Sequence, residues 1–479
     1  MNLWGVILAW LVVVGTYQTV KPLPENININ SADYQVSADE LDFLGDITYT
    51  RSDSQRVSEQ EIFDIIFDII DTAEHYILLD MFLYNSDKGK DFLPYRLVSG
   101  KLTKKLIAKR KSNPSIRIDL ITDPVNTFYG GSPSEQFRAL ENAGINVIIT
   151  NHSKLRDSNP IYSSIWRTFF QWFGNSERFG LIPHPFGKED RVTLRSYLRM
   201  LNMKANHRKL IIADSDGEMV TVVASANPHD ASSAHSNVAV MVKGDIWKEI
   251  YNTEAAVAKF AKKELQNVPE HLMKKSPQAD SDISIRVLSE GSIRDKVYDI
   301  LENSGQGDRI SMAMFYLAER GTVKRLIKAA KNGVDIRLIL DPNKDAFGRK
   351  KNGIPNRPAA SELMNKSDGK IRIRWYDTHG EQFHAKMIIY EKRGGGSSLL
   401  LGSANMTRRN IENFNLELNL LINAKTESET ITKAQDYFET AWEKREQLNQ
   451  TAPFEQYGEN STLKTIIYRI QEFAGLSSF

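Results

Sequence analysis

The hydrophobic pattern predicts two halves, each built from apolar strands that alternate with helical segments. In the first half, a helical pattern over residues 59–74 leads into a mostly apolar stretch of strand length, residues 76–84. A basic helical segment at 101–111 follows, and then apolar strands at 116–122 and 146–150. Strands separated by helical segments favour right-handed crossovers, so this order predicts a mostly parallel sheet with helices on both faces.

The same order of elements returns in the second half. Its helical segments and strands are expected at 293–303, 309–317, 322–331, 336–340 and 371–376. In both halves the first strand contains Met-Phe and the second ends at Asp-Pro. The repeat predicts an α/β fold of two homologous halves, residues 55–275 and 276–445, with the boundary in a polar segment that begins near Ser276.

Each half then carries one copy of a longer motif. The first copy consists of His207, Lys209, Asp214, Ser225 and Asn227. The second copy has the same order and consists of His384, Lys386, Glu391, Ser403 and Asn405. On an extended strand, residues two apart project from the same face, so each His is expected beside its Lys. An imidazole beside an ammonium group is suited to binding a phosphate.

A third His-x-Lys sequence, His152 to Lys154, serves as an internal comparison. It leads into a polar segment that ends at Pro160 and has no strand pattern, which predicts a surface loop. His229 and His235 are likewise expected to be polar groups of a loop. Because so short a motif arises by chance, only the two copies within strand patterns are informative.

The doubled motif and the duplicated halves resemble the phospholipase D superfamily, which includes bacterial phospholipases D and cardiolipin synthases. The resemblance covers about residues 55–445 and differs at Ala224, where the family has Gly, and at Glu391, where it has Asp. It implies one active site at the interface of the halves and phosphodiester chemistry with no metal or other cofactor. Glu417 resembles a downstream acid of the family, and Asn237 occupies the matching place in the first half.

A phosphodiester is an anion with a poor alkoxide leaving group. A site that cleaves it must neutralise charge, supply a nucleophile and protonate the departing oxygen. We expect Lys209 and Lys386 to supply the charge, His207 to attack phosphorus and form a phosphohistidine, and His384 to transfer protons. The hydrogen-bond donors expected for the phosphate oxygens are Ser225, Asn227, Ser403 and Asn405.

Four other polar residues are expected to support these groups. Asp214 and Glu391 either orient an imidazole or cap a turn, and the sequence does not decide between these roles. Asn237 and Glu417 lie on the strands after the Ser-x-Asn sequences, where they are expected to contact catalytic side chains rather than substrate.

The N-terminus predicts a membrane anchor over residues 1–20. Residues 3–20 carry no charge and are long enough to span a bilayer, with Trp4 and Tyr17 near the ends. A cleaved signal peptide would need a basic start and a small-x-small cleavage site, which are missing, and a buried core helix is the other alternative. We expect a single-pass protein of the cell membrane. Its catalytic part is expected outside the cytoplasm, and the sequence does not decide which side of the membrane it faces.

Three further segments complete the expected organisation. Residues 21–54, rich in Asn, Ser and Asp, are expected to form a stalk. Residues 153–199 form an insertion whose aromatics (Trp166, Phe169, Phe170, Trp172, Phe173 and Phe179) either contact lipid or belong to an extra helix on the core. The C-terminal tail, residues 446–479, carries an amphipathic helix from Ser461 that lies on the bilayer or docks on the protein.

Composition narrows the function. The chain has 479 residues, no Cys, and a formal charge of +2 from 62 basic and 60 acidic residues. The absence of Cys excludes disulfides and thiolate chemistry, and the near-neutral charge counts against a nucleic-acid partner despite the basic segment at 101–111. We expect an enzyme acting on phospholipids; a nuclease of the same superfamily and a silent binding protein are the alternatives. Head group, hydrolysis versus transfer, and oligomeric state stay open.

Overall fold

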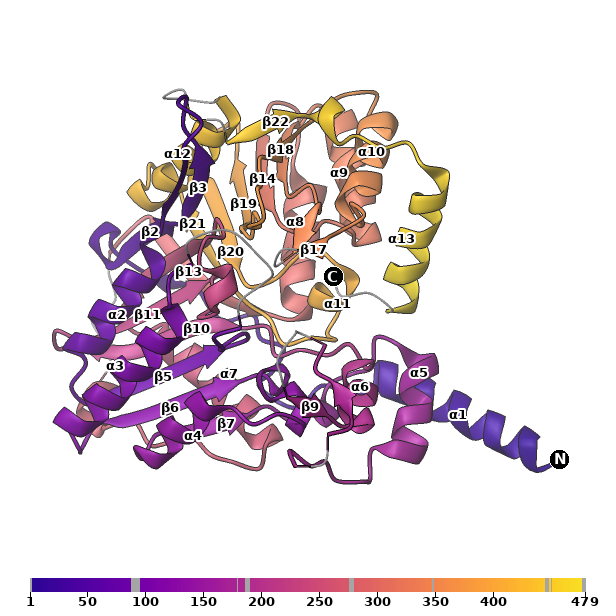
Figure 1. Ribbon diagram of the computed structural model, residues 1–479. Coiled ribbons are helices and arrows are strands. Elements are labelled where there is room, and N and C mark those ends of the chain that lie inside the picture. The colour runs from indigo at the N-terminus through magenta and orange to yellow at the C-terminus, as the bar shows by residue number, and fades with distance from the viewer. Residues whose placement is uncertain are drawn as a thin grey trace.

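The computed structural model describes residues 2–87, 95–178, 180–185, 190–274, 280–346, 349–443, 448 and 450–475. It contains two large sheets, one in each half (Figure 1). The first-half strands are β2 (Leu41–Gly45), β5 (Tyr76–Met81), β6 (Arg117–Thr122), β7 (Asn146–Ile149), β10 (Lys209–Ser215), β11 (Glu218–Ala224) and β12 (Val238–Lys243). They are ordered β2-β12-β11-β10-β5-β6-β7 in space.

The second sheet repeats this order and adds one strand at each edge. Its strands are β1 (Tyr34–Gln35), β13 (Ile283–Ser289), β14 (Arg309–Met314), β15 (Asp335–Leu340), β18 (Ile371–Tyr376), β19 (Lys386–Glu391), β20 (Ser397–Gly402), β21 (Leu418–Ala424) and β22 (Thr451–Pro453). They are ordered β1-β13-β21-β20-β19-β14-β15-β18-β22. The expected α/β fold with two similar halves is confirmed.

The expected mostly parallel pairing is wrong, because both sheets are mixed. Only β5-β6-β7 and β14-β15-β18 pair in parallel, and the remaining ladders of the two sheets' described strands are antiparallel. The motif strand β10 turns directly into β11 through Asp216 and Gly217, whose φ angles are 52° and 84°. An Asp-Gly pair with two positive φ values makes the two-residue turn of a tight hairpin.

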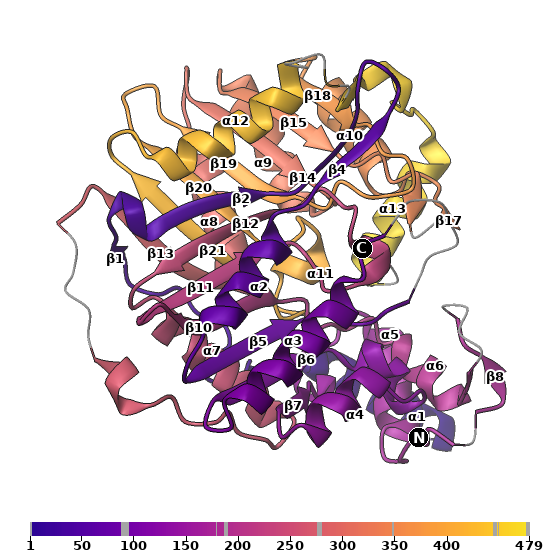
Figure 2. The ribbon, with the colours of Figure 1, turned by 60° about the vertical axis from the view of Figure 1, so that its left-hand side comes forward.

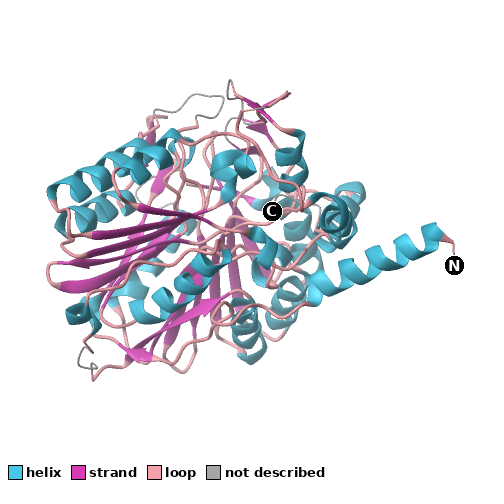
Figure 3. Ribbon diagram, turned by 90° about the horizontal axis from the view of Figure 1, so that it is seen from below, coloured by secondary structure: helices cyan, strands magenta, loops and turns pink. Residues whose placement is uncertain are grey.

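Helices cover the outer face of each sheet (Figure 2). The outer helices are α2 (Ile62–Thr72), α3 (Val98–Ser112) and α4 (Glu135–Asn142) on the first sheet, and α8 (Gly291–Asn303), α9 (Arg320–Lys331) and α10 (Asn356–Lys366) on the second. Helices α7 (Trp247–Phe260) and α12 (Glu429–Glu443) share one core with the inner faces of both sheets. Figure 3 shows the two sheets enclosed between helices, with the N-terminal helix projecting from them.

Residues 21–54 are part of the fold and not a stalk. Strand β1 pairs with β13 in the second sheet, and β2 pairs with β12 in the first. Ile27 and Phe43 are buried in the core that the two halves share. Strand β2 is hard to recognise in the sequence because it has five residues and no alternating pattern, and its partner strand β12 lies about 200 residues away. Strands β3 (Ile47–Thr50) and β4 (Arg56–Glu59) form a hairpin beside it.

Helix α1 (Leu3–Val20) is exposed along most of its length and docks its end on the insertion. It is the only helix of the described residues that is long and apolar enough to cross a membrane, with a mean hydropathy of 1.7. Thr19 Oγ1 donates to Asp157 O at 3.2 Å, and Gly15 lies against Pro160. The insertion contains α5 (Pro160–Ile165), a π-helical turn (Trp166–Phe170), the pair β8 (Ile182–Pro183) and β9 (Arg191–Val192), and α6 (Leu194–Met200). Phe179 lies outside the described residues.

The C-terminal helix α13 (Thr462–Ala474) docks on the second half through one face. Tyr468 is fully buried and donates to Ala318 O at 2.9 Å, while Glu472 accepts the Arg408 N–H at 2.6 Å. Its opposite apolar face, with Leu463 and Phe473, is exposed. Helix α13 therefore docks on the protein and still exposes an apolar face. It lies on the same side of the molecule as α1 and the insertion (Figure 1).

Candidate active site

The two halves contact each other at the residues that precede the motif strands. His207 donates its backbone N–H to Leu416 O in the second half at 2.9 Å, and His384 donates its own to Ser236 O in the first half at 2.8 Å. Lys209 and Lys386 then begin β10 and β19. Each histidine is therefore positioned by its own strand and by the opposite half, at the interface that was expected.

Two carboxylates that the sequence analysis did not assign fix the residue before each histidine. Asp123 Oδ2 accepts the Asn206 N–H at 2.7 Å, and Asp341 Oδ2 accepts the Phe383 N–H at 2.8 Å. Burial raises the pKa of Asp341 to about 6. The repeated Asp-Pro sequence was the available signal for this pair.

His152 corrects the expectation of a surface loop. Its imidazole is buried, and its Nε2 lies 2.8 Å from Asp123 Oδ2, whereas Ser153 and Lys154 are exposed. The third His-x-Lys therefore supports the same carboxylate that positions the first motif, although its Lys is not in the site.

Glu417 of the second half holds His207 of the first. His207 Nδ1 lies 2.9 Å from Glu417 Oε2, which also accepts from Ser403 Oγ at 2.5 Å, and Asn410 Nδ2 donates to the other carboxylate oxygen. Since a carboxylate accepts, Nδ1 carries the hydrogen and the lone pair of the neutral ring lies on Nε2. Burial acts to raise the pKa of Glu417, but His207 and Lys209 outweigh it and hold that pKa below its usual range.

Asn237 of the first half holds His384 of the second in the same way. His384 Nδ1 lies 3.1 Å from Asn237 Oδ1, which also accepts from Ser225 Oγ at 3.2 Å. Asn237 Nδ2 donates to His235 O at 3.1 Å, so the amide oxygen faces the imidazole. His235, expected in a loop, is buried with its ring 5.7 Å from that of His384.

The two lysines are buried beside the histidines. Lys209 Nζ donates to His207 O, and Lys386 Nζ donates to His384 O at 2.7 Å. Burial, opposed in part by Glu417, lowers the pKa of Lys209 to about 7, and burial together with Lys209 lowers the pKa of Lys386 well below its usual range. A phosphate anion placed between the ammonium groups would stabilise their charged forms.

Burial favours the neutral form of both imidazoles. Burial lowers the pKa of His207 to about 4 despite the opposing field of Glu417. Burial, Lys386, His235, Lys209 and His207 lower the pKa of His384. The ring centroids of Phe82 and Phe315 lie 4.8 and 4.9 Å from those of His207 and His384, so each imidazole packs against an aromatic ring.

The serines and asparagines of the motif divide into two groups. Ser225 and Ser403 use their hydroxyls within the protein, since each donates to the support of an imidazole and accepts a backbone N–H at 3.0 Å. They contact Asn237 and Glu417, which corrects their expected role on the phosphate. Asn227 Oδ1 accepts the Leu83 N–H at 3.2 Å, and the buried Asn405 Oδ1 has no hydrogen-bond partner among the described residues.

Asp214 and Glu391 orient neither imidazole. Asp214 lies five residues beyond Lys209 on β10, about 17 Å along a strand, and accepts the N–H groups of His75 and Tyr76 at 3.0 and 2.7 Å. Glu391 ends β19 opposite Arg309, near the surface. The structure therefore favours the structural role for Asp214, whose carboxylate also lies 2.9 Å from Nδ1 of His75, and the carboxylate beside a motif imidazole is Glu417.

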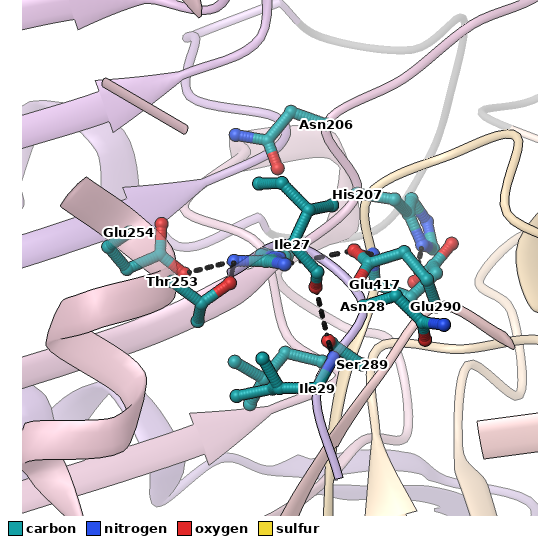
Figure 4. A network of polar contacts seen from close by, with 12 residues as sticks. Ile27, Asn28, Ile29, Asn206, His207, Thr253, Glu254, Ser289, Glu290 and Glu417 are labelled. Carbon is teal, nitrogen blue, oxygen red and sulfur yellow. Dashed lines mark hydrogen bonds and ion pairs between the residues drawn. The ribbon is translucent and has the colours of Figure 1, made fainter. Parts of the chain in front are cut away.

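A buried ion network extends from the first motif into the second half (Figure 4). Arg208 donates to Glu254 and Glu290, both at 2.9 Å, and Glu290 Oε1 accepts the Glu417 N–H at 3.0 Å. The second motif has Ala385 in the corresponding position. The sequence analysis assigned no role to Arg208, because a charged residue between His and Lys looks like any other residue of the strand.

Comparisons with known proteins agree with this geometry. Residues 298–442 match the family described as cardiolipin synthase, PLD-like domain. The phosphatidylserine synthase of Haemophilus influenzae Rd KW20 has the same fold, with a TM-score of 0.55, 10% identity, and 98% of each chain covered. No curated protein matches the chain by sequence.

Two other solved structures show weaker likeness. The polyphosphate kinase of Porphyromonas gingivalis has a TM-score of 0.46 at 12% identity, over 87% of this chain and 48% of that one. The phospholipase D family member Nuc of Salmonella typhimurium has a TM-score of 0.28 at 21% identity, over 36% of this chain and 97% of that one. The family match therefore shows a phospholipase D-like domain in the second half, and the full-length likeness shows that the whole chain shares the fold of the phosphatidylserine synthase.

Proposed function

We propose that the protein is a phospholipid phosphodiesterase or phosphatidyltransferase that works through a phosphohistidine. The observation that carries the proposal is the crossed support of two buried histidines, in which Glu417 holds His207 and Asn237 holds His384 across the interface of the halves. The names of the matching family and of the phosphatidylserine synthase support a phospholipid as substrate.

In the first step, His207 Nε2 attacks phosphorus and the bond from phosphorus to the leaving alcohol breaks. Glu417 stabilises the positive charge that the imidazole gains as the new bond forms. His384 donates a proton from Nε2 to the departing oxygen. Because its pKa is low in the free site, His384 takes up that proton when the anionic phosphate binds between the lysines.

In the second step, His384 accepts a proton from water or from an acceptor alcohol. The oxygen of that molecule attacks phosphorus, the phosphorus to nitrogen bond breaks, and His207 is restored. Water gives hydrolysis and an alcohol gives transfer. Lys209, Lys386, Asn227 and Asn405 bind the non-bridging oxygens in both steps.

The proposed location is a membrane, with α1 as the anchor. Helix α1, the insertion helices α5 and α6, and α13 lie on one side of the molecule (Figure 1). Trp172 and Phe173 of the insertion and Leu463 and Phe473 of α13 are exposed. Exposed apolar surface of this kind is typical of a protein that contacts lipid.

The test is turnover of defined phospholipids by the full chain in uncharged detergent, with EDTA, with and without glycerol, read by mass spectrometry. We expect loss of a head group, a new glycerol ester when glycerol is present, and no effect of EDTA. Cleavage of single-stranded DNA with no action on phospholipids would favour a nuclease instead. The basic helix α3 gives that alternative little support, because Lys101 and Lys105 pair with Asp64 and Asp71.

A further inference from the structure

A cavity of about 590 Å³ opens in the insertion, apart from the two histidine strands. Its described lining is rich in cations and aromatic rings and includes Trp166, Trp172, Phe173, Arg195, Arg199 and Lys204. No Asp or Glu is among the described lining residues. The catalytic function described above does not use any of these side chains.

Two of the cations have no direct anionic partner among the described residues, although the field of the buried Asp123 carboxylate reaches Arg199. Arg167 and Lys204 share Asp157, which lies behind the wall of the cavity. By contrast, neither Arg195 nor Arg199 has a side-chain hydrogen bond or an ion pair within the part of the chain that the structure describes. The cavity therefore has an excess of positive charge that an anion would balance.

The remaining wall is aromatic. The Arg195 guanidinium stacks over Trp166 at 5.1 Å and over Phe173 at 5.7 Å, which holds it at the edge of the cavity. Trp172 and Phe173 are 75% and 66% exposed, so the rings continue from the cavity to the surface. Cations at one end and rings at the other fit a ligand that has an anionic head and an apolar chain.

The cavity also lies where α1 leaves the insertion. Lys21, the residue after α1, donates from Nζ to the carbonyl oxygen of Ser153, a lining residue, at 3.2 Å. If α1 crosses a bilayer, as proposed above, Lys21 marks the level of the head groups and the cavity opens at that level. This placement selects a lipid of the bilayer as the source of the ligand.

We propose that this cavity binds the anionic head group of a phospholipid, with its chain along Trp172 and Phe173, as a second lipid site next to the catalytic centre. The ligand source rests on the proposed membrane location, whereas the binding site does not depend on the catalytic chemistry. His152 lines the cavity and contacts Asp123, which positions the residue before His207, so the two sites are neighbours.

The test is calorimetric titration of the full chain, in uncharged detergent, with octylphosphonate. This probe has the anion and a chain but no phosphoester bond to cleave. Inorganic phosphate, which lacks the chain, and octyltrimethylammonium, which reverses the charge, are titrated in parallel. The variant Arg195→Gln/Arg199→Gln removes the unpaired cations, and Lys154→Gln/Arg178→Gln removes two exposed cations of the insertion outside the cavity lining.

We expect the cavity variant to bind octylphosphonate at least about tenfold more weakly, and the control variant to stay within about twofold of the wild type. Phosphate and octyltrimethylammonium should both bind at least about tenfold more weakly than octylphosphonate. Trp172→Ser, an exposed change that spares the fold, should weaken octylphosphonate and leave phosphate unchanged, and it decides the matter if the double variant unfolds.

Equal binding by the cavity and control variants would overturn the proposal. So would equal affinity for phosphate, which would make this a free-phosphate site, or loss of binding only in Lys209→Gln/Lys386→Gln, which would place the probe between the histidines. Because the readout is binding without turnover, a protein inactive on phospholipids with this pattern intact would refute the proposed function alone.

Discussion

The two histidines occupy equivalent places in the two halves but are held by different groups. His207 faces the carboxylate of Glu417, and His384 faces the amide of Asn237. A carboxylate stabilises an imidazole that becomes positively charged when it bonds to phosphorus, whereas an amide oxygen orients the ring with no net charge. The duplicated fold therefore places the two histidines equivalently. The difference between the acid Glu417 and the amide Asn237 gives the histidines different roles.

Removing each histidine should separate the roles most clearly. On a phosphodiester with a nitrophenolate leaving group, which needs no protonation, His384→Ala should release about one equivalent per enzyme and then stall as a phosphohistidine. His207→Ala should give no burst. On a phospholipid both variants should lose about 10³-fold or more in turnover.

The measurement is rapid-quench release of nitrophenolate. A burst in His207→Ala with none in His384→Ala would reverse the assignment. The absence of a burst in the wild type and in both variants, at a time resolution able to detect one, would contradict the covalent mechanism.

The Arg208 network is the next difference between the halves. Arg208→Met leaves Glu254 and Glu290 without their buried cation, so it should lower the free energy of unfolding by about 3–5 kcal/mol. Arg286→Met, which breaks the partly exposed pair with Asp33, should cost no more than about 1 kcal/mol. Denaturant unfolding of both variants gives the comparison, and similar losses would mean that the buried network is not special.

Making the two supports alike should cost activity. Glu417→Gln removes the charge that stabilises the His207 imidazolium and should reduce kcat by about 10²-fold. The fold control is the unfolding temperature. A variant that stays folded and keeps its full kcat would show that the acid is not needed for attack by His207.

Asn237→Asp should shift the pH profile. A carboxylate beside His384 favours the charged imidazole, so the pKa of His384 should rise by about 1–3 units. Protonated His384 then persists to higher pH in the free enzyme. The limb of the kcat/KM profile that reports loss of this proton should therefore move to higher pH. An unchanged limb would show that this histidine does not set it.

The smallest effect is expected at Glu391, the acid of the second motif. It ends β19 away from the histidines, so Glu391→Gln should change kcat by less than about twofold. Steady-state turnover tests this. A tenfold loss of kcat in a folded variant would show that Glu391 takes part in catalysis.

Much of the site could be predicted from the sequence. The two histidines and the two lysines follow from the repeat, whereas Glu417 was expected from the family resemblance and Asn237 from the matching place in the first half. The sequence could not show that Asn237 and Glu417 each contact the histidine of the opposite half. A repeat shows which residues correspond, but not which half they contact. Arg208 joins the site through its contact with Glu290 across the same interface, and Asn410 joins it through Glu417 within the second half.

One role that was left open and one wrong prediction had readable signals. Asp214 lies an odd number of residues from Lys209 and five steps along the strand, so strand geometry already placed it on the other face and far from His207. The Asp216-Gly217 turn between two apolar runs indicated a hairpin and hence a mixed sheet. Strands β1 and β2 had no such signal, because two and five residues paired with distant partners resemble a loop.

The segment that follows α1 has a consequence for synthesis. It places β1 against β13 of the second half and β2 against β12 of the first, and α12 packs over β2 through Thr430 and Leu41. As the chain leaves the ribosome, residues near 40 can pair with β12 early, but their contacts are complete only when residues near 430 have been made. Neither half can therefore complete its fold alone, and the pairing of histidines from both halves assembles only once nearly the whole chain has been made.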